Sequence, residues 1–299
     1  MNAHGGRLFL SVNATDLGSG ARFEFTQDEF DLLRSDMSQF SISRAVAASS
    51  AFPVYLTPLV LKNYSAEHPQ PEPDWIKAIL EDPAASSRLK CLALEAHSDV
   101  DGRRHFVHLL DGGLSDNLGL RGALDRAMAR EQSFQVPSVP LKIPRRIAII
   151  VVDAHTDRDY GWDDKEHSIG LGELLGSVGR AAVSHYSFET LELFREAMAR
   201  LSRERVAARL QTNDSQLLEI CTYTIELRFN QLANESDRHF FNSVATRLQL
   251  PGPTVGRLKH LAGEELRKNP EFQKLLHDLN RTDERSIANA RLMEPATMS

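Results

Sequence analysis

An apolar run that stops on a carboxylate and two glycines constrains this fold more than any other feature of the chain. Residues 105–120 are HFVHLLDGGLSDNLGL, and LRGALDRAMAR, residues 120–130, continues with helical periodicity. A buried strand that ends in this way and leads into a helix predicts a strand–turn–helix unit of an α/β fold. In sheets of that class, ligand chemistry gathers at the carboxyl ends of strands, and Asp111 lies at such an end.

Strand-like and helix-like segments alternate along the rest of the chain, which favours an α/β fold with a largely parallel sheet. RIAIIVVDAH, residues 146–155, is a β-branched run typical of a central parallel strand. Residues 88–97 and 103–111 both alternate and flank SDVDG, which predicts a hairpin between them. Further strands are expected at residues 7–17, 21–26 and 217–232, and the second of these is expected to pair back on the first as a hairpin. Helices are expected at residues 41–52, 120–130, 170–210, 235–249 and 253–279.

Proline and polar residues mark the expected boundaries between these elements. Pro53 ends the first helix, and Pro251 and Pro253 separate the last two. Residues 65–87 are rich in Pro, Ser, Glu and Asp, which predicts an exposed excursion. The tail from residue 283 is expected to be disordered.

Composition and charge exclude some classes of partner. Hydrophobic residues make up 41% of the 299 residues and charged residues 25%, which is enough for a core of normal size. A net charge of −6 gives no electrostatic reason to expect nucleic acid, and no basic block suits anionic lipid. The longest apolar-leaning run, AVAASSAFPVYLTPLVL, contains two prolines and is too short to span a membrane.

Two cysteines and the N-terminal residues say little about the compartment. Cys91 and Cys221 lie far apart in segments expected to be strands, which favours two buried free thiols over a disulfide. MNAHGGRLFLSVNATDLG lacks the basic start and continuous apolar stretch of a secretory signal.

Asp111 is the strongest candidate for chemistry. Gly112 and Gly113 permit positive φ and the close approach of another segment, and burial would reduce solvation of the carboxylate. A serine hydroxyl bonded to such a carboxylate forms a nucleophile–base pair. The alternative is an Asx-type turn in which Asp111 binds backbone amides.

Three blocks of the chain resemble the patatin-like phospholipases. DGGLSDNLGL is similar to the family's Asp-Gly-Gly block, and SISRAVAASSAFPVYLTPLVL is similar to its Ala-Ser-rich helix with the strand that follows. LFLSVNATDLGSGARFEF matches the strand and turn before that helix, and the likeness covers residues 7–155. The resemblance implies a modified α/β-hydrolase sheet, here N-terminally incomplete and with C-terminal helices. It assigns residues 1–155 to the C-terminal portion of the family domain and 156–282 to an extension packed on it.

The resemblance also implies a reaction. Members are serine acyl hydrolases with a Ser-Asp dyad, so Asp111 would accept the serine proton within the motif Asp111, Gly112 and Gly113. Asp116 and Asn117 would cap the next helix and steady the loop. Substrates would be phospholipids or other acyl esters, with peripheral membrane contact, and the chemistry needs no cofactor.

The sequence departs from the family at the nucleophile. It contains no G-x-S-x-G, and the nearest match, LLGSVG, has Leu175 where the motif needs glycine and places Ser177 after Asp111. The serine and the oxyanion loop are therefore expected upstream of Met1. The chain could be a fragment, the product of a late-started gene model, or a shortened noncatalytic module that binds lipid or protein. A lost N-terminus would remove any export signal, so the sequence leaves both a cytoplasmic and a membrane-associated location open. It also leaves the oligomeric state open.

Other candidate residues have simpler interpretations. Ser49 and Ser50 are expected to allow close helix packing, and not to act as nucleophiles. The acids and histidine of VVDAHTDRD, residues 151–159, are expected to lie in a solvated loop instead of a metal site, and SDVDG lacks the closing glutamate of a calcium loop. Three histidines are expected to share one hairpin: His97, His105 and His108. No cysteine or suitably spaced acidic residue accompanies them, so a zinc site is not expected there.

Overall fold

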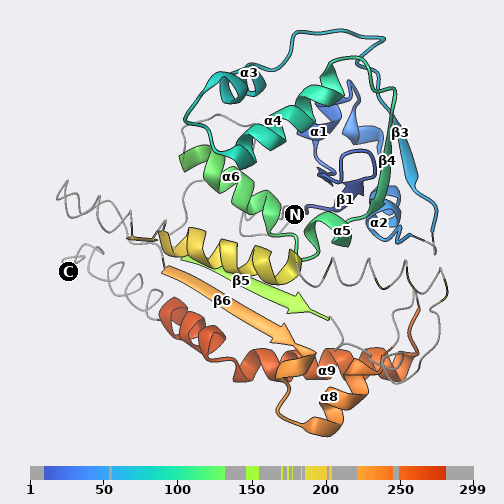
Figure 1. Ribbon diagram of the computed structural model, residues 1–299. Helices are drawn as coiled ribbons and strands as arrows, with labels where there is room; N and C mark the ends of the chain where they lie inside the picture. The colour runs from blue at the N-terminus through green and yellow to red at the C-terminus, as the bar shows by residue number, and fades with distance from the viewer. Residues whose placement is uncertain are drawn as a thin grey trace, which may run out of the picture. The chain divides into compact units, whose positions relative to one another are not determined.

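The protein is mixed α/β with two small sheets (Figure 1). The computed structural model describes residues 10–53, 56–131, 146–154, 170, 174, 177, 183, 186–200, 202–203, 221–244 and 249–280. The chain divides into two compact units: the first comprises Met1–Pro140 and Lys165–Ala197, and the second comprises Leu141–Asp164 and Met198–Ser299. Each unit contains one of the sheets.

The first unit is built on a four-stranded antiparallel sheet in the order β2-β1-β4-β3. Its strands are β1 (Asn13–Asp16), β2 (Arg22–Glu24), β3 (Leu59–Lys62) and β4 (Phe106–Asp111). The expected hairpin of residues 7–17 with 21–26 is confirmed for β1 and β2. The expectation of a largely parallel sheet is wrong for these strands, because one hairpin joins β1 to β2 and the long connections on either side of β3 also return the chain in an antiparallel direction.

Helix α2 (Ile42–Ser49) covers one face of this sheet. Ser41 accepts a hydrogen bond from the Arg44 N–H and begins the helix, whose Ala45 and Ala48 are buried against the sheet. Small side chains at these two positions let the helix approach the strands closely. Aromatic rings from β2 and the segment after it complete this core: Phe23, Phe25, Phe30 and Phe40.

Residues 88–97, expected to be a strand, lie in helix α4 (Ser87–Val100), so the predicted hairpin around SDVDG is wrong. Ser86 caps the helix by accepting from the Leu89 N–H at 3.3 Å. The apolar positions alternate locally, but the buried ones, Leu89, Ala93 and Ala96, follow helical spacing. The Leu, Ala, Lys and Glu content of the segment also favours a helix.

The expected excursion at residues 65–87 contains helix α3 (Asp74–Glu81), which packs on α4. Ile76 and Ile79 are fully buried, so this part of the prediction is wrong. The segment is polar on average, so its composition does not indicate that Ile76 and Ile79 lie one helical turn apart on a buried face. Helices α1 (Gln27–Leu32) and α6 (Arg121–Glu131) also contact α4.

Glu29 of α1 is a half-buried carboxyl among other acids. Burial raises the pKa of Glu29 to about 8; the charge of Arg22 opposes the rise and that of Asp99 adds to it. Because this pKa exceeds the 4.5 of an ordinary glutamate, the unfolding free energy falls as pH rises from 4.5 to about 8.

Glu29→Gln should therefore stabilise the protein above pH 8, where the wild type holds a poorly solvated charge. We expect a gain of about 2–3 kcal/mol at pH 9 and little change near pH 4.5, measured by urea unfolding at both values. The control is Glu81→Gln, whose side chain is 67% exposed. Equal pH dependence in wild type and Glu29→Gln would contradict the assignment.

The second unit contains the parallel pair β5 (Arg146–Asp153) and β6 (Cys221–Arg228). The prediction of a parallel strand at 146–155 is confirmed by this pairing, but its expected central place is not, since β5 has one partner among the described strands. Tyr223 and Ile225 of β6 pack against Leu275 on the helical residues 270–280. Helices α8 (Glu235–Asn242) and α9 (Gly252–Lys268) lie on either side of Pro251.

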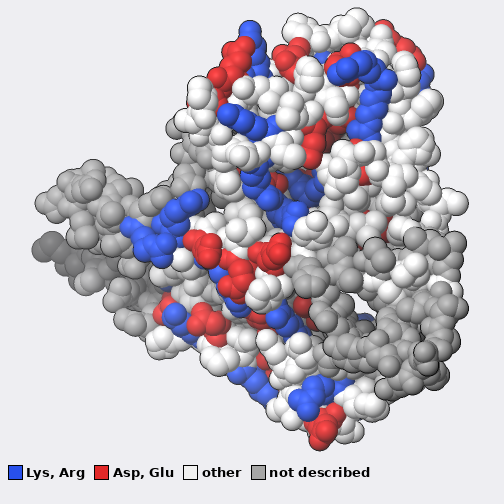
Figure 2. Space-filling model, in the orientation of Figure 1, with Lys and Arg blue, Asp and Glu red and all other residues white. Residues whose placement is uncertain are grey.

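The surface differs from expectation at the cysteines. Cys91 and Cys221 are both free thiols, as expected, but both are exposed, so the prediction of burial is wrong. Acidic and basic side chains lie interspersed over the described surface of the face in Figure 2. None of the described helices has the length and apolar character needed to cross a membrane.

Candidate functional site

The backbone of Asp111, the last residue of β4, is fixed by three contacts. It pairs with Ala14 of β1. Its N–H donates to the Ala51 carbonyl at 3.0 Å, and its own carbonyl accepts from Thr15 Oγ1 at 2.7 Å. The strand end that carries the carboxyl is therefore held by β1 on one side and by the segment after α2 on the other.

The carboxyl of Asp111 is half-buried and forms no ion pair among the described residues. Its Oδ1 accepts from the Gly113 N–H at 2.7 Å, which is the Asx-type turn left open as the alternative. The described residues provide no hydrogen bond to its Oδ2. Burial raises the pKa of Asp111, and the Gly113 hydrogen bond only partly offsets the rise. This carboxyl therefore accepts a proton more readily than a solvated aspartate does.

Both positions of the motif require glycine, because a side chain at either one would collide with neighbouring atoms. A Cβ on Gly112 would lie 2.2 Å from the Asn13 carbonyl oxygen and 3.4 Å from Ser49 Oγ. A Cβ on Gly113 would lie 2.9 Å from Asp111 Oδ1. The first glycine allows β1 to approach the turn, and the second allows the turn to close on the carboxyl.

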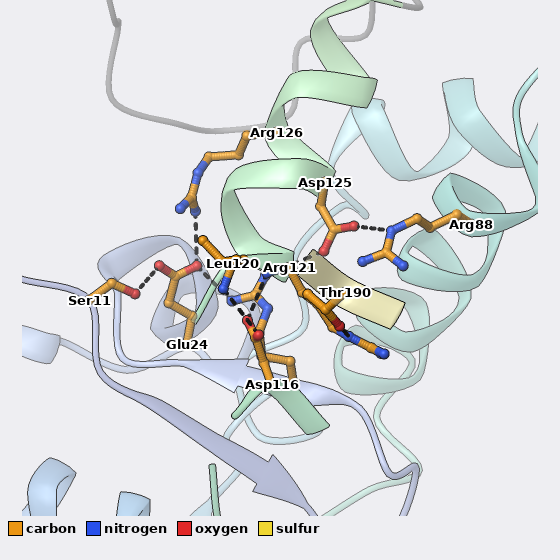
Figure 3. Close-up of polar contacts among 10 residues, drawn as sticks. Ser11, Glu24, Arg88, Asp116, Leu120, Arg121, Asp125, Arg126 and Thr190 are labelled. Atoms are coloured by element: carbon orange, nitrogen blue, oxygen red, sulfur yellow. Dashed lines mark hydrogen bonds and ion pairs between the residues drawn. The ribbon is translucent and has the colours of Figure 1, made fainter. Parts of the chain in front are cut away.

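Asp116 is a buried carboxyl at the end of α5 (Gly113–Asp116). Its Oδ1 accepts from the Leu120 N–H at 3.1 Å and its Oδ2 from the Arg121 N–H at 3.0 Å, where α6 begins (Figure 3). The prediction that Asp116 caps this helix is confirmed.

Asn117 does not cap α6, so the prediction is wrong for this side chain. Its Nδ2 donates to Ser187 Oγ at 2.9 Å, and its Oδ1 lies 3.0 Å from the point where a Cβ added to Gly113 would stand. Helical residues 186–200 thus contact the loop that follows Asp111. Leu191 and Phe194 of this helix are buried, as its apolar spacing predicts.

Behind this loop, arginines and carboxylates form a network that fixes α6 to β2 and α4 (Figure 3). Glu24 accepts from Arg22 at 2.8 Å and from Arg126 at 2.9 Å, and Asp125 forms ion pairs with Arg22 and Arg88. Burial alone would raise the pKa of Glu24, but the charge of Arg22 and the hydrogen bond from Arg126 lower it to about 2.

Two hydroxyl residues near Asp111, Thr15 and Ser115, are not predicted from the sequence to lie there. Thr15 Oγ1 lies 2.8 Å from Ser115 Oγ, and both residues are buried. The only sequence signal was a polar residue within an apolar strand segment, which does not identify a partner 100 residues away. Ser49 lies beside Gly112 without a hydrogen bond to the Asp111 carboxyl among the described atoms, as expected for a packing serine.

The candidate metal residues do not converge in the described part of the chain. No group of three or more His, Cys, Asp or Glu that could hold a metal ion occurs among the described residues. His97 lies on α4 and hydrogen-bonds to Glu72, so the three histidines do not share one hairpin. Of the acids and histidine in VVDAHTDRD, only Asp153 lies within the described residues.

Comparison with known proteins identifies no relative: the chain matches no family model, no curated protein and no solved structure. The chemistry of the site therefore has to be argued from its residues. A half-buried carboxyl with one oxygen held by a backbone amide, on a strand end fixed on both sides, is equipped to accept a proton from a group placed at its second oxygen.

Proposed function

We propose that Asp111 is the general base of a serine acyl hydrolase similar to the patatin-like phospholipases. The observation that supports this most directly is the Asp111 carboxyl itself. Its Oδ1 is occupied by the Gly113 N–H, no cation pairs with it among the described residues, and burial raises its pKa. An ion pair would hold the carboxylate in its charged form and make it a poorer base.

In this proposal the nucleophilic serine comes from a segment outside the 299 residues. The serine oxygen attacks the carbonyl carbon of an acyl ester while its proton passes to the Asp111 carboxylate. The tetrahedral intermediate expels the alcohol, which takes that proton, and an acyl-enzyme remains. Water then attacks the acyl group, gives its proton to Asp111, and the serine leaves with that proton. The substrate class is phospholipid or another acyl ester, at a membrane surface.

The test uses both the chain and its genomic context. The reading frame upstream of the Met1 codon should encode G-x-S-x-G, and the longer protein should hydrolyse p-nitrophenyl acyl esters. Asp111→Asn keeps the shape of the side chain and removes the base, so we expect a loss of about 10³-fold or more in kcat/KM. A matched control is Asp28→Asn, an aspartate in the first turn of α1.

The 299-residue protein should not react with a fluorophosphonate serine probe. Labelling that Asp111→Ala removes would show that this chain contains the nucleophile and would overturn its placement elsewhere. An upstream stop codon, or a longer enzyme in which Asp111→Asn retains full activity, would exclude the proposal.

A second candidate function is a noncatalytic module that binds an extended chain. Among the described residues, β5 pairs only with β6, and its Ile150 and Val152 are 48% and 66% exposed. A strand of another chain could add to this edge through main-chain hydrogen bonds. This function would survive Asp111→Asn unchanged, so the same variant separates the two candidates.

A further inference from the structure

We infer that Asn117 is a positioning residue for Asp111, held in its orientation by Ser187 of the helical residues 186–200. The inference deepens the proposed function, because it takes Asp111 as the base and names what fixes its hydrogen bond. It rests on two hydrogen bonds, from Asn117 to Ser187 and from Gly113 to Asp111, and on the closeness of the Asn117 amide oxygen to Gly113.

The hydroxyl of Ser187 determines which way the Asn117 amide faces. Ser187 Oγ donates to the Val183 carbonyl at 2.7 Å, which uses its single proton. It can therefore only accept from Asn117, and the group 2.9 Å away must be Nδ2. The amide oxygen of Asn117 then faces Gly113. Ser187 is 8% exposed, so water competes little for this bond.

Two side-chain oxygens lie on the same side of Gly113, where any other residue would carry its side chain. A Cβ added to Gly113 would lie 3.0 Å from Asn117 Oδ1 and 2.9 Å from Asp111 Oδ1, and the Gly113 N–H donates to that same Asp111 oxygen at 2.7 Å. The amide of Asn117 thus fills the space beside the turn, next to the carboxylate oxygen that the turn binds. A displaced Asn117 would allow the Gly113 N–H to turn away and would weaken the only hydrogen bond that the described residues give to this carboxyl.

The same helix has a second attachment that does not involve Gly113. Arg121 Nε donates to Thr190 Oγ1 at 3.1 Å, and the Arg121 guanidinium lies 5.0 Å from the centre of the Tyr186 ring. Thr190 is 3% exposed, so its burial matches that of Ser187. Thr190→Val removes a buried hydrogen bond of the same helix but leaves Asn117 and its partner intact, which provides a matched control.

The experiment titrates the Asp111 carboxyl directly. The protein is labelled with ¹³C-aspartate, the Asp111 signal is assigned by its absence in Asp111→Asn, and its chemical shift is followed with pH. Asn117→Ala and Ser187→Ala should each raise the proton affinity of Asp111 by about three- to tenfold, because a hydrogen bond to the charged form weakens. Thr190→Val should leave it unchanged.

An unchanged Asp111 titration in Ser187→Ala would overturn the inference, as would an equal shift in Thr190→Val. Ser187→Ala alone decides the matter if Asn117→Ala does not fold. The readout needs no substrate and no nucleophile. Failure of the hydrolase proposal and failure of this inference are therefore seen in different measurements.

Discussion

Gly112→Ala should abolish stable folding of the first unit or lower its unfolding free energy by more than about 4 kcal/mol. The added Cβ would lie 2.2 Å from the carbonyl oxygen of Asn13 and 2.8 Å from its carbonyl carbon. Both atoms belong to the backbone of β1 next to its pairing with β4, so neither can move without breaking the sheet. Denaturant unfolding followed by circular dichroism measures the loss.

The matched control is Gly256→Ala in α9, where an added Cβ meets no atom within 4 Å. Alanine is favoured over glycine inside a helix, so this variant should gain up to about 1 kcal/mol. A Gly112→Ala protein as stable as the wild type would show that β1 does not approach the turn this closely.

Glu24→Gln should lower the unfolding free energy at pH 7 by about 3 kcal/mol, because it leaves two arginines without their shared carboxylate. Glu24 is 3% exposed and accepts from Arg22 and Arg126, as well as from Ser11. Its pKa of about 2 lies below the ordinary 4.5. Its contribution is therefore complete above pH 4.5 and is lost as pH falls toward 2.

Thermal or urea unfolding at pH 7 and pH 2.5 tests both parts of this expectation, and the difference between wild type and variant should shrink at the lower pH. Breaking the exposed i, i+4 pair Lys77–Glu81 by Glu81→Gln should cost less than about 0.5 kcal/mol. A Glu24→Gln effect as small as this would mean that solvent screens the network.

Sequence reasoning succeeded where local pattern and burial agree. The β1–β2 hairpin, the β-branched strand β5 and the helix after Asp116 follow from turn residues, apolar runs and a capping carboxylate. It failed at α4, because a short segment with apolar residues at both period 2 and period 3.6 does not choose between strand and helix. The expected parallel pairing is confirmed for β5 with β6 and wrong for β1 to β4, because no local pattern fixes the direction in which distant strands such as β1 and β4 pair.

The candidate site could be predicted in part. The role of glycine beside Asp111 follows from the residue types, and both glycines prove to be closely approached. The Asn117–Ser187 contact spans 70 residues, and no local pattern encodes such a partner. The proton-acceptor role of Asp111 comes from a resemblance and stays a prediction, which the hydrolysis assay tests.

The hydrogen bond from Thr15 to the Asp111 carbonyl joins residues 96 positions apart. Closing so long a loop carries a large entropic penalty before any contact compensates for it, and topologies rich in such contacts fold slowly. The strand end that bears the carboxylate thus assembles only once distant parts of the chain have met. Amide exchange at Gly112, whose N–H is bonded to the Ser49 carbonyl, should accordingly report global opening of the first unit and not local fraying.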